Sequence, residues 1–170
     1  YEAVYMSGGL TSAQYGFPDV GLTTMTEVVA NAGYVAAATS LPVLSDADTG
    51  YGNAINVRRT VQAFIRAGVA GVHIEDQLAP KRCGFVSGKQ LIPLEEAVGK
   101  YRAALDARDE LDPDFVIVAR TDARTAAGGG LEEALRRAKA YKEAGADVVY
   151  FEGPQSLDEL RLARAAVSGP

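Results

Sequence analysis

Two aspartates separated by one small residue form the segment of this sequence best suited to chemistry. They lie in Asp46-Ala47-Asp48-Thr49-Gly50, where an apolar stretch ends and glycine allows the backbone to turn sharply. Hard divalent cations such as Mg²⁺ prefer carboxylate and water oxygens, and often use only one or two protein carboxylates. The spacing therefore favours a metal site, but a solvated acidic turn that caps the next helix would have the same pattern.

A second acidic pair and an arginine follow other apolar stretches. Glu75 and Asp76 end one stretch, and Arg120 ends another. Carboxylates gathered in one place repel each other unless a cation or protons intervene, so convergence would strengthen the metal hypothesis. An arginine there suits a bidentate grip on a substrate carboxylate. The alternative is that these acids only form ion pairs with Lys81, Arg82 or Arg120.

Two further segments carry groups that could react or bind. Cys83 lies between a basic residue and a glycine, and nearby cations favour thiol reactivity, although a lone cysteine is commonly inert packing. Ser7-Gly8-Gly9 offers a hydroxyl and consecutive backbone N–H groups that could bind an anion, or it is a plain turn. His73 lies inside an apolar stretch, so we interpret it as a core histidine and leave it out of the site.

The elements that must position these residues alternate along the chain. Short β-branched runs predict strands at residues 3–7, 43–46, 72–75, 115–120 and 148–152. Helical periodicity predicts helices near residues 24–31, 55–67, 94–107, 131–144 and 157–165. Near-continuous apolar strands that alternate with helices indicate a parallel sheet covered by helices.

Two α/β architectures fit this alternation. An open doubly wound sheet binds ligands mainly at one switch point, whereas a (β/α)8 barrel brings all its strand ends to one site. Polar residues occur at the end of every predicted strand: Ser7, Asp46, Asp48, Glu75, Asp76, Arg120, Asp122 and Glu152. We therefore predict one domain over residues 1–170, an incomplete (β/α)8 TIM-type barrel of about five βα units. One strand before Tyr1 and two after Pro170 would complete it.

Composition excludes several other classes of protein. The 170 residues are 48% hydrophobic, which is enough for one sizeable core. A net charge of −5 with scattered basic residues argues against a nucleic-acid partner. No apolar run approaches the ~20 residues that span a bilayer, so we expect no membrane association. The single cysteine excludes an internal disulfide and fits a cytoplasmic protein.

Together these segments resemble the isocitrate lyase/phosphoenolpyruvate mutase superfamily, and within it the methylisocitrate lyase-like branch. The matching motifs follow one another over essentially the whole chain: YMSGG at 5–9, GFPD at 16–19, DADTGYG at 46–52, HIEDQ at 73–77, KRCG at 81–84, ARTDA at 119–123 and FE at 151–152. The resemblance implies a (β/α)8 barrel that binds Mg²⁺ or Mn²⁺ and stabilises a 2-oxo-acid enolate. It also implies a small 2-oxo or 2-hydroxy carboxylate as ligand and a homodimer or homotetramer.

The resemblance assigns roles to matching residues. Asp46 and Asp48 would bind the metal, while Asp19 and Glu75 would hold metal-bound waters. The catalytic residues would be Tyr5, Cys83 and Arg120, with Cys83 as the acid/base on a mobile loop. The residues that bind substrate would be Ser7, Gly8, Gly9, Gly84, Arg120 and Glu152.

One residue departs from the lyase pattern. Phe85 follows the Cys-Gly pair where these lyases usually carry histidine, and it cannot tune the thiol or contact a carboxylate. Cys83, which the mutase branch lacks, still favours a lyase. We expect an Mg²⁺-dependent carbon–carbon lyase that cleaves a 2-hydroxy di- or tricarboxylate resembling methylisocitrate. The alternatives are an oxaloacetate decarboxylase, a phosphonopyruvate hydrolase or a phosphonomutase on the same scaffold, or a non-catalytic ligand-binding module.

Overall fold

A computed structural model describes residues 1–167 and residue 169. In this part of the chain a single parallel sheet contains β1 (Val4–Met6), β2 (Val43–Asp46), β3 (Gly71–Glu75), β4 (Val116–Thr121) and β5 (Val148–Phe151). The helices are α1 (Gly8–Gln14), α2 (Met25–Ala37), α3 (Ala54–Arg66), α4 (Leu94–Leu111), α5 (Leu131–Glu143) and α6 (Leu157–Ala166). None of the helices among these residues is long and apolar enough to cross a membrane.

The predicted strands and helices are all present, with ends that differ by up to six residues, but helix α1 was not predicted. Two glycines open this helix, and glycine is a poor helix former, so residues 8–14 show no helical periodicity. The helix is supported instead by its ends and neighbours. Ser7 caps it by accepting a hydrogen bond from Leu10 N–H, and Thr11 donates its hydroxyl proton to the Ser7 carbonyl at 2.9 Å.

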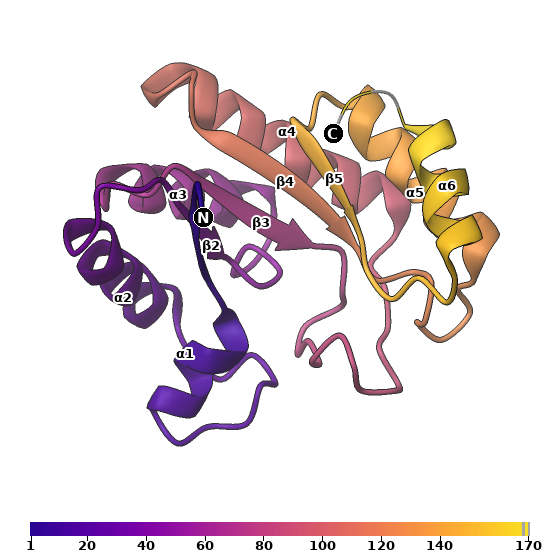
Figure 1. Ribbon diagram of the computed structural model, residues 1–170, viewed down its shortest axis with the longest axis horizontal. Helices are drawn as coiled ribbons and strands as arrows, with labels where there is room; N and C mark the ends of the chain where they lie inside the picture. Colours follow the sequence, from indigo (N-terminus) through magenta and orange to yellow (C-terminus); the bar gives the residue numbers. More distant parts are fainter. Residues whose placement is uncertain (168, 170) are drawn as a thin grey trace.

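The order of the strands decides between the two architectures. A doubly wound sheet reverses its strand order at a switch point and carries helices on both faces. Here the order is β1-β2-β3-β4-β5, and every neighbouring pair is parallel. Right-handed connections in that order place the helices on one face, and Figure 1 shows the curved sheet with α3 and α4 behind it. The structure confirms the barrel-type fold, of which this chain forms five consecutive strands.

The hydrophobic core lies between the sheet and its helices. Alternate side chains of each strand point toward the helices, and Ile74 and Ile117 are at most 1% exposed. They belong to the same buried cluster as Phe64 of α3 and Tyr101 of α4. The Tyr101 hydroxyl lies 3.0 Å from the carbonyl oxygens of Ile74 and Arg120. This tyrosine therefore fixes the ends of β3 and β4, the part of the sheet that carries the acidic residues and the arginine.

The remaining side chains form the concave face of the sheet. The register pairs Asp46 with His73, Glu75 with Arg120, and Arg120 with Tyr150. Because parallel strands present their carboxyl ends at one edge, these polar side chains meet there.

Candidate active site

A strained turn aims two carboxylates into the carboxyl edge of the sheet. Asp46 and Asp48 are 6% and 5% exposed, and Asp48 N–H donates to Asp46 Oδ1 at 2.9 Å. Asp48 has a φ of 46° and Tyr51 a φ of 58°, values that residues other than glycine rarely adopt. Glu75 N–H donates to the Asp48 carbonyl at 2.9 Å and attaches this turn to the end of β3. Backbone strain of this kind is commonly found at functional sites.

Two glycines bring the start of α1 against these carboxylates. Gly8 N–H donates to Asp46 Oδ2 at 3.0 Å. A Cβ atom at Gly8 would lie 2.6 Å from that oxygen and 3.2 Å from Asp48 Oδ1, and one at Gly9 would lie 3.1 Å from Asp19 Oδ2. Only glycine permits so close an approach at Gly8. Ser7-Gly8-Gly9 is thus the cap and first turn of a helix. The Gly8 N–H, one of the groups predicted to bind an anion, already donates its hydrogen bond to Asp46.

Asp19, Asp46, Asp48 and Glu75 form an acidic cluster at this edge of the sheet. Lys81 enters the acidic cluster from the loop between β3 and α4. Its ammonium forms ion pairs with Asp19 and, at 2.8 Å, with Asp48. Burial lowers the pKa of Lys81, but attraction from Asp48 and Glu75 outweighs it and keeps the pKa above the usual value. Of the ion pairs considered as an alternative for Glu75 and Asp76, the structure shows the one between Glu75 and Arg120, whereas Lys81 pairs with Asp19 and Asp48 and Asp76 pairs with Arg137.

Burial and mutual repulsion control the titration of the cluster. Burial raises the pKa of Asp48, and repulsion from Asp46 adds to the effect. Burial also holds the pKa of Glu75 well above its usual value, against the attraction of Arg120. Burial opposes the ionisation of Asp46 as well, but His73 and Lys81 keep its pKa below the usual range. The site thus holds more acidic groups than its cations can neutralise.

A buried carboxylate oxygen of the cluster supports the fit of a metal ion. Glu75 Oε1 is buried and accepts no hydrogen bond from the described residues, a state that costs about 1–3 kcal/mol, and the buried Asp48 Oδ1 has the Lys81 ammonium at 2.8 Å as its ion-pair partner. A divalent cation with its waters would supply positive charge and donors here. Among the described residues, no three acid, histidine or cysteine side chains converge closely enough to ligate an ion together. The geometry suits Mg²⁺ or Mn²⁺ held by one or two carboxylates and water.

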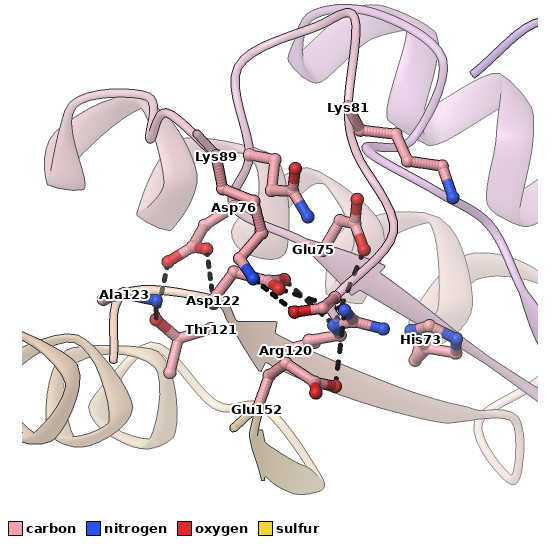
Figure 2. Close-up of polar contacts among 12 residues, drawn as sticks. His73, Glu75, Asp76, Lys81, Lys89, Arg120, Thr121, Asp122, Ala123 and Glu152 are labelled. Atoms are coloured by element: carbon pink, nitrogen blue, oxygen red, sulfur yellow. Dashed lines mark hydrogen bonds and ion pairs between the residues drawn. The ribbon is translucent and has the colours of Figure 1, made fainter. Parts of the chain in front are cut away.

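Arg120 forms the centre of a second group of charges beside the acidic cluster (Figure 2). This Arg120 group consists of Arg120 and the carboxylates of Glu75, Asp122 and Glu152. The Nε and Nη2 of Arg120 donate to Asp122 at 2.9 and 3.0 Å. The same guanidinium lies 3.5 Å from Glu75 Oε2 and 3.3 Å from Glu152 Oε2. It also lies 5.7 Å from the centre of the Tyr150 ring. Arg120 is therefore held in place by three carboxylates, with its orientation fixed before any substrate carboxylate arrives.

Asp76 separates from its neighbour Glu75 because successive residues of a strand point to opposite faces. It accepts hydrogen bonds from Thr121 Oγ1 at 2.8 Å, Asp122 N–H at 3.0 Å and Tyr141 Oη at 2.6 Å. Asp76 supports the segment that carries Asp122 but does not reach the acidic cluster.

His73, interpreted from the sequence as a core histidine and left out of the site, is buried but lies beside the predicted site residues Tyr5 and Asp46. His73 is 4% exposed, but its Nε2 lies 2.5 Å from Tyr5 Oη and 3.3 Å from Asp46 Oδ1. Its Nδ1 is buried and has no hydrogen-bond partner in the part of the chain that the structure describes. The period of two in a strand could have identified it, because His73 and Glu75 must share one face.

A cavity of about 320 Å³ lies on the concave face of the sheet, next to His73 and Arg120. Its lining combines polar and apolar side chains: Tyr5, Leu44, His73, Val118, Arg120 and Tyr150. Small-molecule sites are commonly clefts of this size with a few convergent polar groups. The cavity therefore suits a small carboxylate bound through Arg120.

The loop between β3 and α4 contacts the Arg120 group through Gly84. A Cβ atom at Gly84 would lie 2.8 Å from Arg120 Nη2 and 3.0 Å from Glu152 Cδ. The predicted substrate residues Gly84, Arg120 and Glu152 are therefore brought together by the fold. Cys83 is half-buried in the same loop, whereas Phe85 is 96% exposed.

The family model of phosphoenolpyruvate phosphomutase matches residues 1–170 of this chain. The chain belongs to this family. The predicted membership of the isocitrate lyase/phosphoenolpyruvate mutase superfamily is thereby confirmed.

The relatives of this phosphoenolpyruvate phosphomutase family member include named lyases. The 2,3-dimethylmalate lyase of Eubacterium barkeri is 49% identical over 99% of this chain and 57% of its own length. The 2-methylisocitrate lyase of Shewanella oneidensis is 48% identical over 100% of this chain and 57% of its own length. This chain thus spans little more than half the length of these curated relatives.

Solved structures agree with the sequence relatives. A crystal structure of 2,3-dimethylmalate lyase, described as a PEP mutase/isocitrate lyase superfamily member, matches with a TM-score of 0.94 and 40% identity, covering 99% of this chain and 56% of that one. A phosphonopyruvate hydrolase in complex with oxalate and Mg²⁺ matches with a TM-score of 0.86 and 36% identity, covering 100% of this chain and 58% of that one. The fold is shared by lyases and a hydrolase.

Proposed function

We propose that this chain carries the active-site part of an Mg²⁺-dependent carbon–carbon lyase that cleaves a small 2-hydroxy dicarboxylate or tricarboxylate. The observation that carries the proposal is the contact of the Cys83 loop, through Gly84, with Arg120 and Glu152 beside the acidic cluster. The names of the relatives that are 48–49% identical support the reaction class.

The acidic cluster and the Arg120 group would divide the binding of the substrate. Asp46 and Asp48 would hold Mg²⁺ or Mn²⁺, with Asp19 and Glu75 acting through water. The cation, when bound, would stabilise negative charge on the oxygen of the 2-oxo-acid product. Arg120, with Ser7, Gly8, Gly9 and Gly84, would bind and orient the carboxylate end of the substrate, and Glu152, which pairs with Arg120, would complete the pocket.

Cleavage of the bond between C2 and C3 requires two proton movements. A carboxylate of the acidic cluster would accept the proton of the C2 hydroxyl as the C2–O bond becomes a carbonyl, and the C2–C3 electron pair moves to C3, which must then be protonated. Burial and Asp46 raise the pKa of Tyr5, so its hydroxyl stays protonated and would orient the substrate by donating a hydrogen bond. The Cys83 thiol would deliver its proton to the C3 carbanion from the opposite side.

Phe85 favours a substrate that is less anionic than methylisocitrate. 2,3-Dimethylmalate is a dicarboxylate with a methyl group on each carbon of the bond that breaks, whereas 2-methylisocitrate carries a third carboxylate. An apolar side chain directly after the Cys83-Gly84 pair offers no partner for that third carboxylate. We therefore favour the dicarboxylate as the better substrate.

Product analysis on the whole protein tests this function. With Mg²⁺ present, we expect pyruvate and propionate from 2,3-dimethylmalate, and slower release of pyruvate and succinate from 2-methylisocitrate. Turnover of oxaloacetate or phosphonopyruvate alone would instead identify a decarboxylase or a hydrolase. Absence of turnover together with absence of Mg²⁺ binding in calorimetry would point to a non-catalytic ligand-binding module.

The variant Phe85→His should shift substrate preference toward the tricarboxylate. A hydrogen bond to a charged group contributes about 1.5–3 kcal/mol, so the ratio of kcat/KM for 2-methylisocitrate over 2,3-dimethylmalate should rise by about tenfold or more. Leu111→His is the control, because Leu111 is 44% exposed and ends α4 at the opposite edge of the sheet from the site. An unchanged ratio in Phe85→His would remove Phe85 from the account of specificity.

Properties of the whole protein are part of the proposal, because the chain spans little more than half of its relatives. A homodimer or homotetramer and a cytoplasmic location are predicted by the sequence resemblance and the single cysteine. Size-exclusion chromatography with light scattering would measure the assembly.

A further inference from the structure

The loop between β3 and α4 is closed at its base by a short antiparallel stem. Gln77 forms a bridge with Leu91, and Leu78 N–H donates to the Gln90 carbonyl at 2.8 Å. Residues 79–89 therefore form a compact loop whose two ends are attached to each other and to the sheet. The position of Cys83 and Gly84 then depends on what fills the interior of this loop.

Two long polar side chains fill that interior, and each is 1% exposed. Gln77 accepts from Arg82 N–H and donates to the Arg82 carbonyl, both at 2.9 Å. The Lys89 ammonium donates to the carbonyl of Gly84 and, at 3.3 Å, to that of Val86. The two side chains thus replace hydrogen bonds that the loop backbone does not make with itself.

The contacts of Lys89 indicate that its side chain supports the backbone of the loop. A buried ammonium is costly unless it is paired or hydrogen-bonded, and Lys89 has no carboxylate partner among the described residues. Its own carbonyl accepts from Ala127 N–H at 2.9 Å, which attaches it to the segment that follows β4. Figure 2 shows the ammonium beside the Arg120 group. Lys89 therefore connects, through its backbone, to the segment that follows β4 and, through its side chain, to the turn that carries Gly84.

We propose that Lys89 is a positioning residue that holds the Cys83–Val86 turn closed against Arg120 and Glu152 before substrate binds. The carbonyls that it binds belong to Gly84, directly after Cys83, and to Val86. A shift of this turn would separate Gly84 from Arg120 and move the thiol together with it. The kinetic part of this inference rests on the proposed lyase function, but the position of the loop can be measured without any substrate.

Alkylation of Cys83 by iodoacetamide measures the position of the loop directly. Lys89→Met removes the ammonium and keeps an unbranched apolar side chain. The alkylation rate at Cys83, followed on its peptide by mass spectrometry, should rise by about tenfold or more, as expected for the loss of a charge-assisted hydrogen bond. With 2,3-dimethylmalate, kcat should fall by a similar factor and KM should change less. Lys89→Arg, which retains charge and donors, should restore part of both quantities.

Lys139→Met is the matched control, because Lys139 is exposed on α5 and its only ion pair is with Glu143 at 3.8 Å among the described residues. Both rates should stay at the wild-type values in this control. An unchanged alkylation rate in Lys89→Met would overturn the inference, even if turnover fell. Faster alkylation in a protein without lyase activity would support the inference and contradict the proposed function. If Lys89→Met does not melt cooperatively, slower alkylation in Lys89→Arg than in Lys89→Gln supports the inference, and equal rates overturn it.

Discussion

Replacing Cys83 by serine should lower kcat for 2,3-dimethylmalate by about 10²–10⁴, the usual contribution of a general acid or base. A serine hydroxyl is a far weaker acid than a thiol, so proton transfer to the C3 carbanion would be slower. KM should change little, because Arg120 and the acidic cluster hold the other end of the substrate. Steady-state kinetics of the wild type and of Cys83→Ser measure both quantities.

The loop should keep its shape in this variant. The Cys83 contact that supports the turn is made by its backbone carbonyl, which accepts from Val86 N–H at 2.9 Å and does not involve the thiol. Cys83→Ala serves as a control, since it removes the acid entirely and should be at least as slow as Cys83→Ser. Wild-type turnover in Cys83→Ser would make the thiol a bystander and would favour the decarboxylase or hydrolase alternatives.

Removing the metal should abolish turnover, and removing one carboxylate should remove most of the increase in Tm that the metal produces. Excess EDTA should stop the reaction, and Mg²⁺ or Mn²⁺ should restore it. At 100 times its Kd, a bound ion stabilises a folded protein by about 2.7 kcal/mol, so Mg²⁺ should raise the Tm of the wild type by several degrees. Asp48→Asn should lose most of that rise.

The Tm of Asp48→Asn measured without metal gives a second test, because a general folding defect would lower this Tm. Burial and repulsion from Asp46 raise the pKa of Asp48, so its carboxylate destabilises the metal-free fold. Without metal, Asp48→Asn should melt at or above the wild-type Tm. Asp106→Asn, on the exposed face of α4, should keep both the Tm and its response to Mg²⁺. Undiminished wild-type turnover in excess chelator would exclude the metal mechanism.

Local patterns account for the residues whose place could be predicted. The strands that end at Asp46 and Glu75 are buried runs, and a run that must be buried is visible in the sequence alone. Helix α1 lacked such a signal because Gly8 and Gly9 open it, and it depends on the Ser7 cap and on packing. His73 was missed because every residue of β3 is buried, so burial did not distinguish core from site.

The sequence by itself determined the α/β class, the acids and arginine at the strand ends, and the family. Only the tertiary structure decided which of these groups meet. Strand order and register place Glu75 beside Arg120, and they turn Asp76 to the other side. Gly8 reaches Asp46 across 38 residues, and Lys89 supports a loop that contacts Arg120. Periodicity reflects the neighbours of a residue along the chain, whereas these contacts depend on how separate elements pack, which no local pattern encodes.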